Sequence, residues 1–97
     1  MAAIRVYTTA WCGYCSGAKR YLTDRKRVLF DEIDLTGDPA GRARLRDQTG
    51  RTTVPQIFIG DVHVGGYDDL RALDARGGLD PLLASLGPGE RITGTPA

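Results

Sequence analysis

The chain has 97 residues, 41% of them hydrophobic and 26% charged, which suits one hydrophobic core but not two separate domains. With 13 Lys and Arg against 12 Asp and Glu, the formal net charge is +1, so the charge does not favour nucleic acid or an anionic membrane as a partner. No apolar run reaches the length of a signal sequence or a transmembrane helix, and we therefore expect a cytoplasmic protein in a reducing environment.

The first third of the chain alternates strand and helix patterns. Residues 2–9 carry apolar side chains at alternate positions, which predicts a strand. From residue 12 to about residue 26, apolar side chains recur at i, i+3 and i+4, which predicts an amphipathic helix. Residues 27–35 predict a second strand. The candidate core residues of these elements are Ile4, Val6, Ala18, Tyr21, Leu22, Val28, Phe30 and Ile33.

The middle of the chain predicts a helix and a hairpin. Residues 36–50 begin with possible N-cap residues and a proline and end with a glycine, an order typical of a helix. Residues 57–59 and 62–64 are short apolar runs separated by Gly60 and Asp61. They predict two antiparallel strands joined by a tight turn.

The last third predicts two further helices and a tail. Residues 68–78 begin with two aspartates and end with two glycines, and the stretch LDPLLASLG from residue 79 predicts one more short helix. Residues 87–97 lack apolar periodicity. We therefore expect a domain of residues 1–86 followed by a flexible C-terminal tail.

This order of elements, β-α-β-α-β-β-α with a short final helix, predicts an α/β fold. The first strand, helix and second strand form a βαβ unit, so these two strands are expected to be parallel with a right-handed crossover. The hairpin adds an antiparallel pair, which gives a four-stranded mixed sheet flanked by helices on both faces. Residues 12–15 then lie at the carboxyl end of the first strand, where open α/β sheets bind ligands.

The chain has two cysteines, Cys12 and Cys15, at the junction of the first strand and the first helix. A structural zinc site needs about four ligands, and the one histidine, His63, is predicted to face solvent on an alternating strand. A disulfide across so short a loop removes little entropy from the unfolded chain. The spacing favours redox chemistry, because a helix start can expose one sulfur while the other lies a turn inside, within bonding distance.

Cys12 is predicted to be the attacking cysteine. Unpaired N–H groups and the positive end of the helix dipole favour a thiolate there, and Lys19 and Arg20 either add positive field or form a solvated helix face. A stabilised thiolate is more abundant but less nucleophilic, and the two effects nearly cancel at a Brønsted slope of about 0.45. What improves is the departure of Cys12 from a mixed disulfide, so a mixed disulfide on Cys12 is the expected intermediate.

The chain resembles bacterial dithiol glutaredoxins, of the thioredoxin superfamily, in four segments that follow in the family's order and spacing: CGYC, RTTVPQIFIG, GGYDDL and ALDARGGLDPLL. The similarity extends from about Ile4 to Leu86. It implies a thioredoxin-like fold and glutathione-dependent reduction of protein disulfides and glutathione mixed disulfides. In that reaction Cys12 attacks the glutathionyl sulfur, a second glutathione releases oxidised glutathione, and Cys15 resolves protein disulfides.

The resemblance also implies a glutathione site. A cis peptide before Pro55 turns the backbone of Val54 toward the cysteinyl part of the ligand. The helix start at Asp68 and Asp69 offers N–H groups to the γ-glutamyl carboxylate, and the Asp69 carboxylate holds the amino group. Taken alone, Pro55 is also compatible with the opening of a strand, and Asp68 and Asp69 are more typical of an ordinary helix N-terminus than of a binding site. The implied glutathione-binding residues are Tyr14, Arg42 (for the glycine carboxylate), Thr53, Val54, Pro55, Gly66, Asp68 and Asp69.

Two positions depart from the family pattern. Thr9 stands where many relatives carry a lysine near the thiolate, which removes one source of positive field. Gly13 follows Cys12 where proline is commoner, and some CGYC relatives hold a [2Fe–2S] cluster between two protomers, ligated by one cysteine from each chain and two glutathione thiols. A dimeric cluster carrier with Cys12 as its ligand is therefore an alternative, which visible absorbance of anaerobically purified protein would reveal.

A second alternative is a redoxin reduced by thioredoxin reductase, which the segment WCGYC permits, whereas TVP and GGYDDL favour glutathione. We expect no resident metal and, in the absence of a cluster, a monomer. Its expected partners are glutathione and disulfide-containing or glutathionylated proteins. Tyr14 is expected to flank the binding groove, and Trp11 either borders it or covers the edge of the core.

Overall fold

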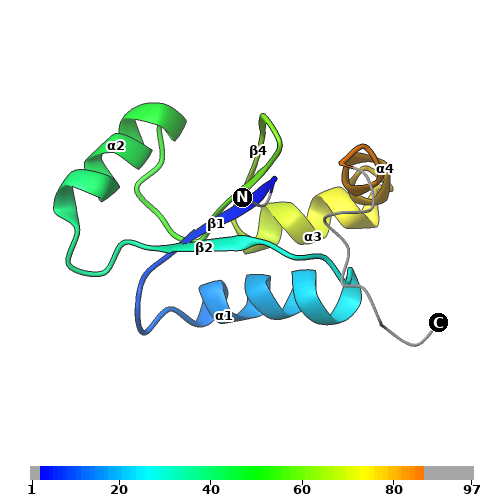
Figure 1. Ribbon diagram of the computed structural model, residues 1–97, viewed down its shortest axis with the longest axis horizontal. Helices are drawn as coiled ribbons and strands as arrows, with labels where there is room; N and C mark the ends of the chain where they lie inside the picture. Colours follow the sequence, from blue (N-terminus) through cyan, green and yellow to red (C-terminus); the bar gives the residue numbers. More distant parts are fainter. Residues whose placement is uncertain (1–2, 87–97) are drawn as a thin grey trace.

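A four-stranded sheet forms the centre of the protein, with helices on both of its faces (Figure 1). The computed structural model describes residues 3–86. In chain order the elements are β1 (Ile4–Thr8), α1 (Gly13–Arg20), the π-helical turn η1 (Tyr21–Arg25), β2 (Asp31–Asp34), α2 (Pro39–Thr49), β3 (Gln56–Ile59), β4 (Val62–Gly65), α3 (Tyr67–Ala75) and α4 (Leu79–Ala84).

The strands lie in the order β2-β1-β3-β4 across the sheet. β1 and β2 are parallel, whereas β1 and β3, and β3 and β4, are antiparallel. The parallel pair is connected through α1 and η1, as expected for a βαβ unit, and β3 and β4 form the predicted hairpin. The predicted α/β class and the mixed four-stranded sheet are confirmed.

The alternation of side chains along the strands separates two clusters of buried residues. Ile4 and Val6 point to the face covered by α1, α3 and α4, and Tyr7 points to the face covered by α2. The larger cluster consists of Ile4, Val6, Ala18, Leu22, Val28, Ile57, Ile59, Leu70, Leu79 and Leu83, and the smaller one of Leu35, Leu45 and Phe58. Burying a side chain such as Leu22 contributes about 1.5–3 kcal/mol. Leu22 therefore helps to hold η1 against the sheet.

The second strand is shorter than predicted. Of the predicted residues 27–35, only Asp31–Asp34 form the strand. Arg27 has a left-handed backbone with a φ of 56°, and the Val28 N–H donates to the Leu22 carbonyl at 3.2 Å. These features make the first part of the segment a turn out of the helix instead of an extended strand. The Val28 side chain is nevertheless buried in the core, as predicted.

The helix predicted to reach about residue 26 ends in the π-helical turn η1, where the Lys26 N–H donates to the Tyr21 carbonyl at 3.2 Å. The Tyr21 hydroxyl donates to the Asp74 carboxylate. The Lys26 ammonium lies 2.7 Å from Asp74 and 3.0 Å from Asp80. These contacts join η1 to α3 and α4, and the Lys26 ammonium holds the pKa of Asp74 below its ordinary value.

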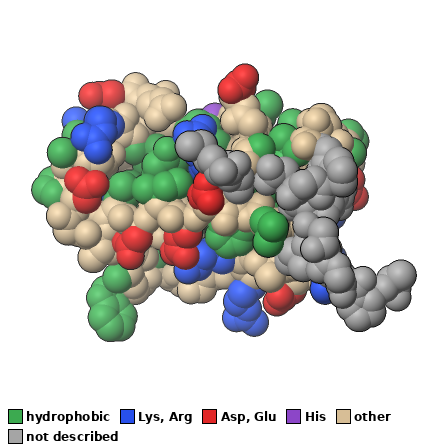
Figure 2. All heavy atoms as spheres, in the orientation of Figure 1, with side chains coloured by type: hydrophobic (Ala, Val, Ile, Leu, Met, Phe, Trp, Pro, Cys, Tyr) green, Lys and Arg blue, Asp and Glu red, His purple; other side chains and the backbone are tan. Residues whose placement is uncertain are grey.

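The surface carries charges of both signs. Figure 2 shows acidic and basic side chains interspersed on one face of the molecule, without a broad area of either sign. This agrees with the net charge of +1. Within residues 3–86, the helices lack the combination of length and apolar character that crossing a membrane requires. The predicted tail, residues 87–97, lies outside the described residues.

Candidate active site

Cys12 occupies the N-cap position of α1, just beyond the carboxyl end of β1. Its backbone is extended, with φ −106° and ψ 106°, and its Sγ accepts a hydrogen bond from the Cys15 N–H at 3.1 Å. A helix N-terminus leaves such N–H groups unpaired, so a sulfur at this position receives one of them together with the positive end of the helix dipole. The thiol is partly exposed, which leaves it open to attack a disulfide.

Cys15 differs from Cys12 in burial: its side chain is only 2% exposed, against the core. Burial, followed by the hydrogen bond to Cys12, raises the pKa of the Cys15 thiol from 9.0 to about 11. The negative charge of Cys12 acts in the same direction, whereas a backbone hydrogen bond from Thr9 and the charge of Lys19 oppose it. At neutral pH, Cys15 therefore keeps its proton while Cys12 is the accessible sulfur.

This difference predicts selective alkylation. We expect iodoacetamide at pH 7.5 to modify the folded, reduced protein once, at Cys12, and to reach Cys15 only after denaturation. Intact-mass analysis and peptide mapping measure the number of adducts and their positions. Two adducts on the folded protein at pH 7.5 would contradict the expectation.

The raised pKa of Cys15 also makes stability depend on pH. As pH rises, the Cys15 thiol ionises in the unfolded chain before it ionises in the folded protein, so the stability linked to this proton is lost between pH 9 and about 11.

A cleft of about 150 Å³ lies beside Cys12. The Cys12 thiol donates to the Val54 carbonyl at 3.8 Å, and the Val54–Pro55 peptide bond is cis, as the resemblance predicted. The cleft is thus formed where the start of α1, the turn before β3 and the start of α3 meet. Its lining residues are Tyr14, Arg51, Thr53, Val54, Pro55, Gly66, Tyr67, Asp68 and Asp69.

The start of α3 is built around Asp69. The helix begins at Tyr67, one residue before the predicted start, with Gly66 as its N-cap. Asp69 Oδ2 accepts the Gly66 N–H at 2.9 Å and lies 2.7 Å from Arg51 Nη1. The Arg51 guanidinium, followed by the Gly66 N–H, holds the pKa of Asp69 below its ordinary value. Asp69 is therefore an anion in the cleft at neutral pH.

Arg51 is a cleft residue that the sequence analysis did not identify. It opens the segment RTTVPQIFIG, but nothing local distinguishes it from the other exposed arginines of the chain. Its partner, Asp69, is 18 residues further along. The only available signal was its place in the same segment as Thr53 and Val54.

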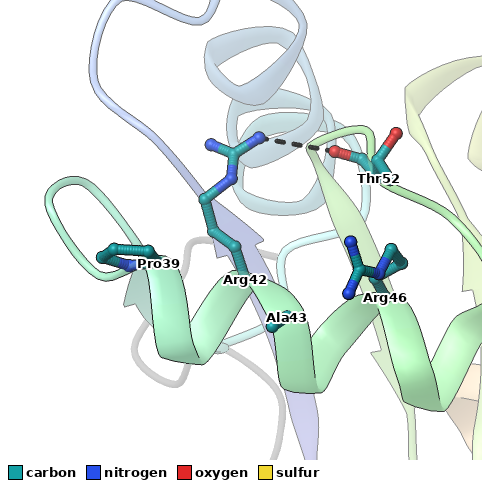
Figure 3. Close-up of a pocket in the computed structure, with 5 residues that line it drawn as sticks. All are labelled: Pro39, Arg42, Ala43, Arg46 and Thr52. Atoms are coloured by element: carbon teal, nitrogen blue, oxygen red, sulfur yellow. Dashed lines mark hydrogen bonds between the residues drawn. The ribbon is translucent and has the colours of Figure 1, made fainter.

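Arg42 lies apart from this cleft. Figure 3 shows Arg42 and Arg46 projecting from α2 toward the segment that contains Thr52, around a pocket of about 210 Å³. Arg42 Nη2 donates to the Thr52 carbonyl at 3.4 Å. Arg42 also lines a groove that contains Thr9 and Trp11, which precede Cys12 in the chain. Of the ten predicted site residues, Arg42 is the one that the structure places on a different hollow.

The structure places two single side chains, His63 and Trp11, more exactly than the sequence did; His63 is half-buried. His63 does not face open solvent: its Nε2 lies 2.6 Å from Gln56 Oε1 and its ring packs 4.9 Å from that of Phe58. Because Gln56 and Phe58 project from the neighbouring strand on the same face, they cover His63, and burial lowers its pKa. Of the two positions left open for Trp11, the structure excludes the one that covers the edge of the core, since the side chain is fully exposed.

Lys19, on α1, forms an ion pair with a residue of β2. Lys19 lies 3.0 Å from Glu32, which also accepts the Thr8 hydroxyl at 2.8 Å. Lys19 is thus not simply a solvated charge, although a pair this exposed contributes little to stability.

Within the described part of the chain, no three His, Cys, Asp or Glu side chains are arranged to hold a metal ion. A bridged [2Fe–2S] cluster, which takes only Cys12 from each chain, stays a prediction.

An accessible and a buried cysteine, one helical turn apart where the first strand of a βαβ unit meets its helix, define a dithiol oxidoreductase with a thioredoxin-like fold. Comparison with known proteins is more specific. Residues 4–64 match the family model for Glutaredoxin, and the chain belongs to the glutaredoxin family.

Individual relatives agree with this assignment. The chain is 54% identical to Glutaredoxin 3 of Escherichia coli K12 over 83 residues, covering 86% of this chain and 99% of that protein. It is also 54% identical to a glutaredoxin of Pseudomonas aeruginosa over 85 residues, covering 88% and 100%. The buckwheat glutaredoxin–glutathione complex superimposes with a TM-score of 0.79 at 35% identity, over 88% of this chain and 79% of that one. The thioredoxin-like fold and the thiol–disulfide oxidoreductase class predicted from the sequence are confirmed.

Proposed function

We propose that the protein reduces disulfides at the expense of glutathione, through a mixed disulfide between Cys12 and glutathione. The observation that supports this best is the cleft beside Cys12, which brings together Val54, whose carbonyl contacts the Cys12 thiol, and the amino end of α3. The buckwheat neighbour, solved as a glutathione complex, has the same fold. A tripeptide thiol with two carboxylates and one ammonium group suits a cleft that offers the Val54 backbone and the amino end of α3.

The proposed ligand lies with its sulfur at Cys12. Its cysteinyl part pairs with the backbone of Val54 in the manner of an added strand. The γ-glutamyl end reaches the start of α3, where the N–H groups of Asp68 and Asp69 are oriented toward an anion and the Asp69 carboxylate toward the amino group. Arg42, from α2, is the candidate for the glycine carboxylate. Tyr14, which is 65% exposed, forms an aromatic wall.

The reaction begins with attack of the Cys12 thiolate on the glutathionyl sulfur of a protein–glutathione mixed disulfide. The new S–S bond joins Cys12 to glutathione, the old one breaks, and the protein thiolate leaves and takes up a proton. The thiolate of a second glutathione then attacks the glutathionyl sulfur of the Cys12–glutathione disulfide, and oxidised glutathione departs. In that second step Cys12 leaves as a thiolate, which the Cys15 N–H at 3.1 Å is positioned to stabilise.

Cys15 is proposed to act when the substrate is a protein disulfide. Cys12 first forms a mixed disulfide with one protein sulfur, and Cys15 then attacks Cys12, giving a Cys12–Cys15 disulfide and a reduced protein. Burial, the largest cause that raises the pKa of Cys15, remains, but the two smaller ones, the hydrogen bond to Cys12 and its charge, disappear once Cys12 is in a disulfide. The backbone of Thr9 and the charge of Lys19 still lower it. Cys15 therefore becomes easier to ionise at the moment it is needed.

We further propose that the protein works as a monomer in a reducing compartment such as the cytoplasm, on disulfide-containing or glutathionylated proteins. An accessible dithiol persists only where reductant is abundant. Residues 1–86 are proposed to form the whole catalytic domain, because the cleft and both cysteines lie within them.

The reductant that the protein uses distinguishes a glutathione-dependent enzyme from the alternative, a redoxin reduced by thioredoxin reductase. We expect turnover of the mixed disulfide of glutathione and 2-mercaptoethanol when the protein is coupled to glutathione and glutathione reductase, followed through NADPH consumption. We expect thioredoxin reductase, at matched activity and without glutathione, to sustain less than about a tenth of that rate. Equal or faster turnover with thioredoxin reductase would show that the protein is a different kind of redoxin.

A further inference from the structure

Gln56 is a polar residue that is fully buried, although it directly follows the segment of Val54 and Pro55 in the cleft. Burying a carboxamide is unfavourable unless its N–H groups and its oxygen have partners. Gln56 Nε2 donates to the Thr53 carbonyl at 2.8 Å and to the Thr53 hydroxyl at 3.3 Å. Gln56 Oε1 lies 2.6 Å from His63 Nε2. The Gln56 side chain thus connects β4 to the edge of the cleft.

These contacts fix the orientation of the amide and the position of the proton on His63. A carbonyl oxygen only accepts hydrogen bonds, so the atom 2.8 Å from the Thr53 carbonyl has to be the amide nitrogen. The amide oxygen then faces His63, and because it also only accepts, His63 Nε2 has to carry a proton. Burial and the charge of Arg51 lower the pKa of His63, against the opposing charge of Asp69. The ring is therefore neutral at pH 7.5, with no proton on Nδ1.

The Thr53 carbonyl belongs to the same peptide unit as the Val54 N–H. This peptide bond is trans, and in a planar trans unit the C=O and the N–H point in opposite directions. Because the buried Gln56 holds the Thr53 carbonyl, the Val54 N–H points away from the core. Val54 lines the cleft, and its own carbonyl accepts from the Cys12 thiol at 3.8 Å. An extended ligand that pairs with Val54 as a strand needs this N–H as a donor.

His63 is itself held by its neighbours. It lies opposite Phe58 in the β3–β4 pair, and the centres of the two rings are 4.9 Å apart. The guanidinium carbon of Arg5 lies 4.8 Å from the centre of the Phe58 ring. The imidazole is therefore packed in place and has little freedom to turn away from Gln56.

We propose that His63 is a positioning residue: by donating from Nε2 to Gln56, it holds the Gln56 amide on the Thr53 carbonyl and so directs the Val54 N–H into the cleft. This proposal rests on the proposed use of glutathione, whose cysteinyl carbonyl is the acceptor for that N–H. His63 and Gln56 do not contact the ligand. They favour ligands that carry a peptide group next to the reacting sulfur, and they leave the chemistry of Cys12 unchanged.

The first measurement is the position of the proton on His63 in the reduced protein without substitutions. The sequence contains one histidine, so the imidazole signals belong to His63. We expect long-range proton–nitrogen correlation spectra at pH 7.5 to show a neutral ring with its proton on Nε2. A neutral ring with its proton on Nδ1 would overturn the proposal, because Nε2 would then have nothing to donate to Gln56.

The second measurement compares two disulfides in the Cys15→Ser protein. One is the mixed disulfide of glutathione and 2-mercaptoethanol, and the other is bis(2-hydroxyethyl) disulfide, which has no peptide group. The Cys12 thiolate bonds to the glutathionyl sulfur or to one sulfur of the second disulfide, and the S–S bond breaks. In both reactions 2-mercaptoethanol leaves as a thiolate and takes up a proton. Mass spectrometry follows each adduct with time and gives a second-order rate constant.

We expect His63→Phe, which keeps a ring but loses the N–H, to lower the rate constant for the glutathione disulfide about fivefold and that for bis(2-hydroxyethyl) disulfide less than about twofold. His63→Gln, whose amide nitrogen reaches the place of Nε2, recovers most of the difference. Tyr21→Phe is the matched control, because it removes a hydrogen bond to Asp74 outside the cleft, and it changes neither rate. Circular dichroism shows whether each variant is folded.

Other outcomes overturn the proposal in distinguishable ways. Equal losses with both disulfides mean that His63 acts on Cys12 or on the whole fold and not on the Val54 N–H. No loss with either means that the hydrogen bond from His63 does not position the cleft. A selective loss of the same size in Tyr21→Phe means that general destabilisation is the cause. If the Cys15→Ser protein with His63 intact reacts equally fast with both disulfides, the proposed function fails first, and the role of His63 fails with it, whichever nitrogen carries the proton.

Discussion

Replacing Cys12 with serine is expected to abolish disulfide reduction, whereas replacing Cys15 is not. A serine hydroxyl is not ionised near neutral pH and forms no disulfide, so Cys12→Ser should retain less than about a thousandth of the activity in the glutathione-coupled assay. Cys15→Ser keeps the helix start and the N–H that bonds Cys12 Sγ. It should therefore reduce glutathione mixed disulfides at a rate within about a factor of two of the unmodified protein.

When the substrate is a protein disulfide, Cys15→Ser is expected to lose activity as well. Without Cys15, the mixed disulfide between Cys12 and the protein has no internal attacker, and reduction of a protein disulfide such as that of insulin should fall at least about tenfold. The covalent complex should accumulate and be visible by non-reducing electrophoresis. Reduction of glutathione mixed disulfides that survives Cys12→Ser, or that is lost equally in both variants, would contradict the assigned roles.

Gly65→Ala is expected to damage stability and glutathione use together. Gly65 has a φ of 111°, a conformation that costs a residue with a side chain about 1–3 kcal/mol. Its new Cβ would also lie 2.4 Å from Asp69 Oδ2, so the carboxylate that we propose to bind the glutathione amino group has to move. We expect a lower Tm and a KM for the glutathione mixed disulfide at least about tenfold higher.

Gly77→Ala is the matched control for this prediction. Gly77 has a φ of 79°, and a Cβ there meets nothing within 4 Å. It should cost about 1–2 kcal/mol of stability through backbone strain, with KM unchanged. Thermal unfolding by circular dichroism and the coupled assay are measured on both variants. If the two alanine variants raise KM alike, the effect of Gly65→Ala comes from general destabilisation and not from the displacement of Asp69.

Features that depend on neighbours along the chain were predicted well. The C-x-x-C pair at a strand–helix junction, the hairpin at Gly60 and Asp61, and the helix ended by Gly50 all rest on local backbone preferences. The second strand was predicted too long because its start depends on how the chain packs and not on local preferences alone. Its apolar residues suit a strand, but the left-handed backbone of Arg27 belongs to a turn whose Val28 packs into the core from a helix end.

By itself, the sequence determined the α/β class, the position of the two cysteines and which of them begins the helix, because periodicity and capping act within a few residues. Only the tertiary structure decided how deeply Cys15 is buried and that Arg51 meets Asp69 across 18 residues. It also decided that Arg42 lines a separate hollow and that His63 is covered. Burial and the meeting of distant charges depend on how whole elements pack, and no local pattern encodes them.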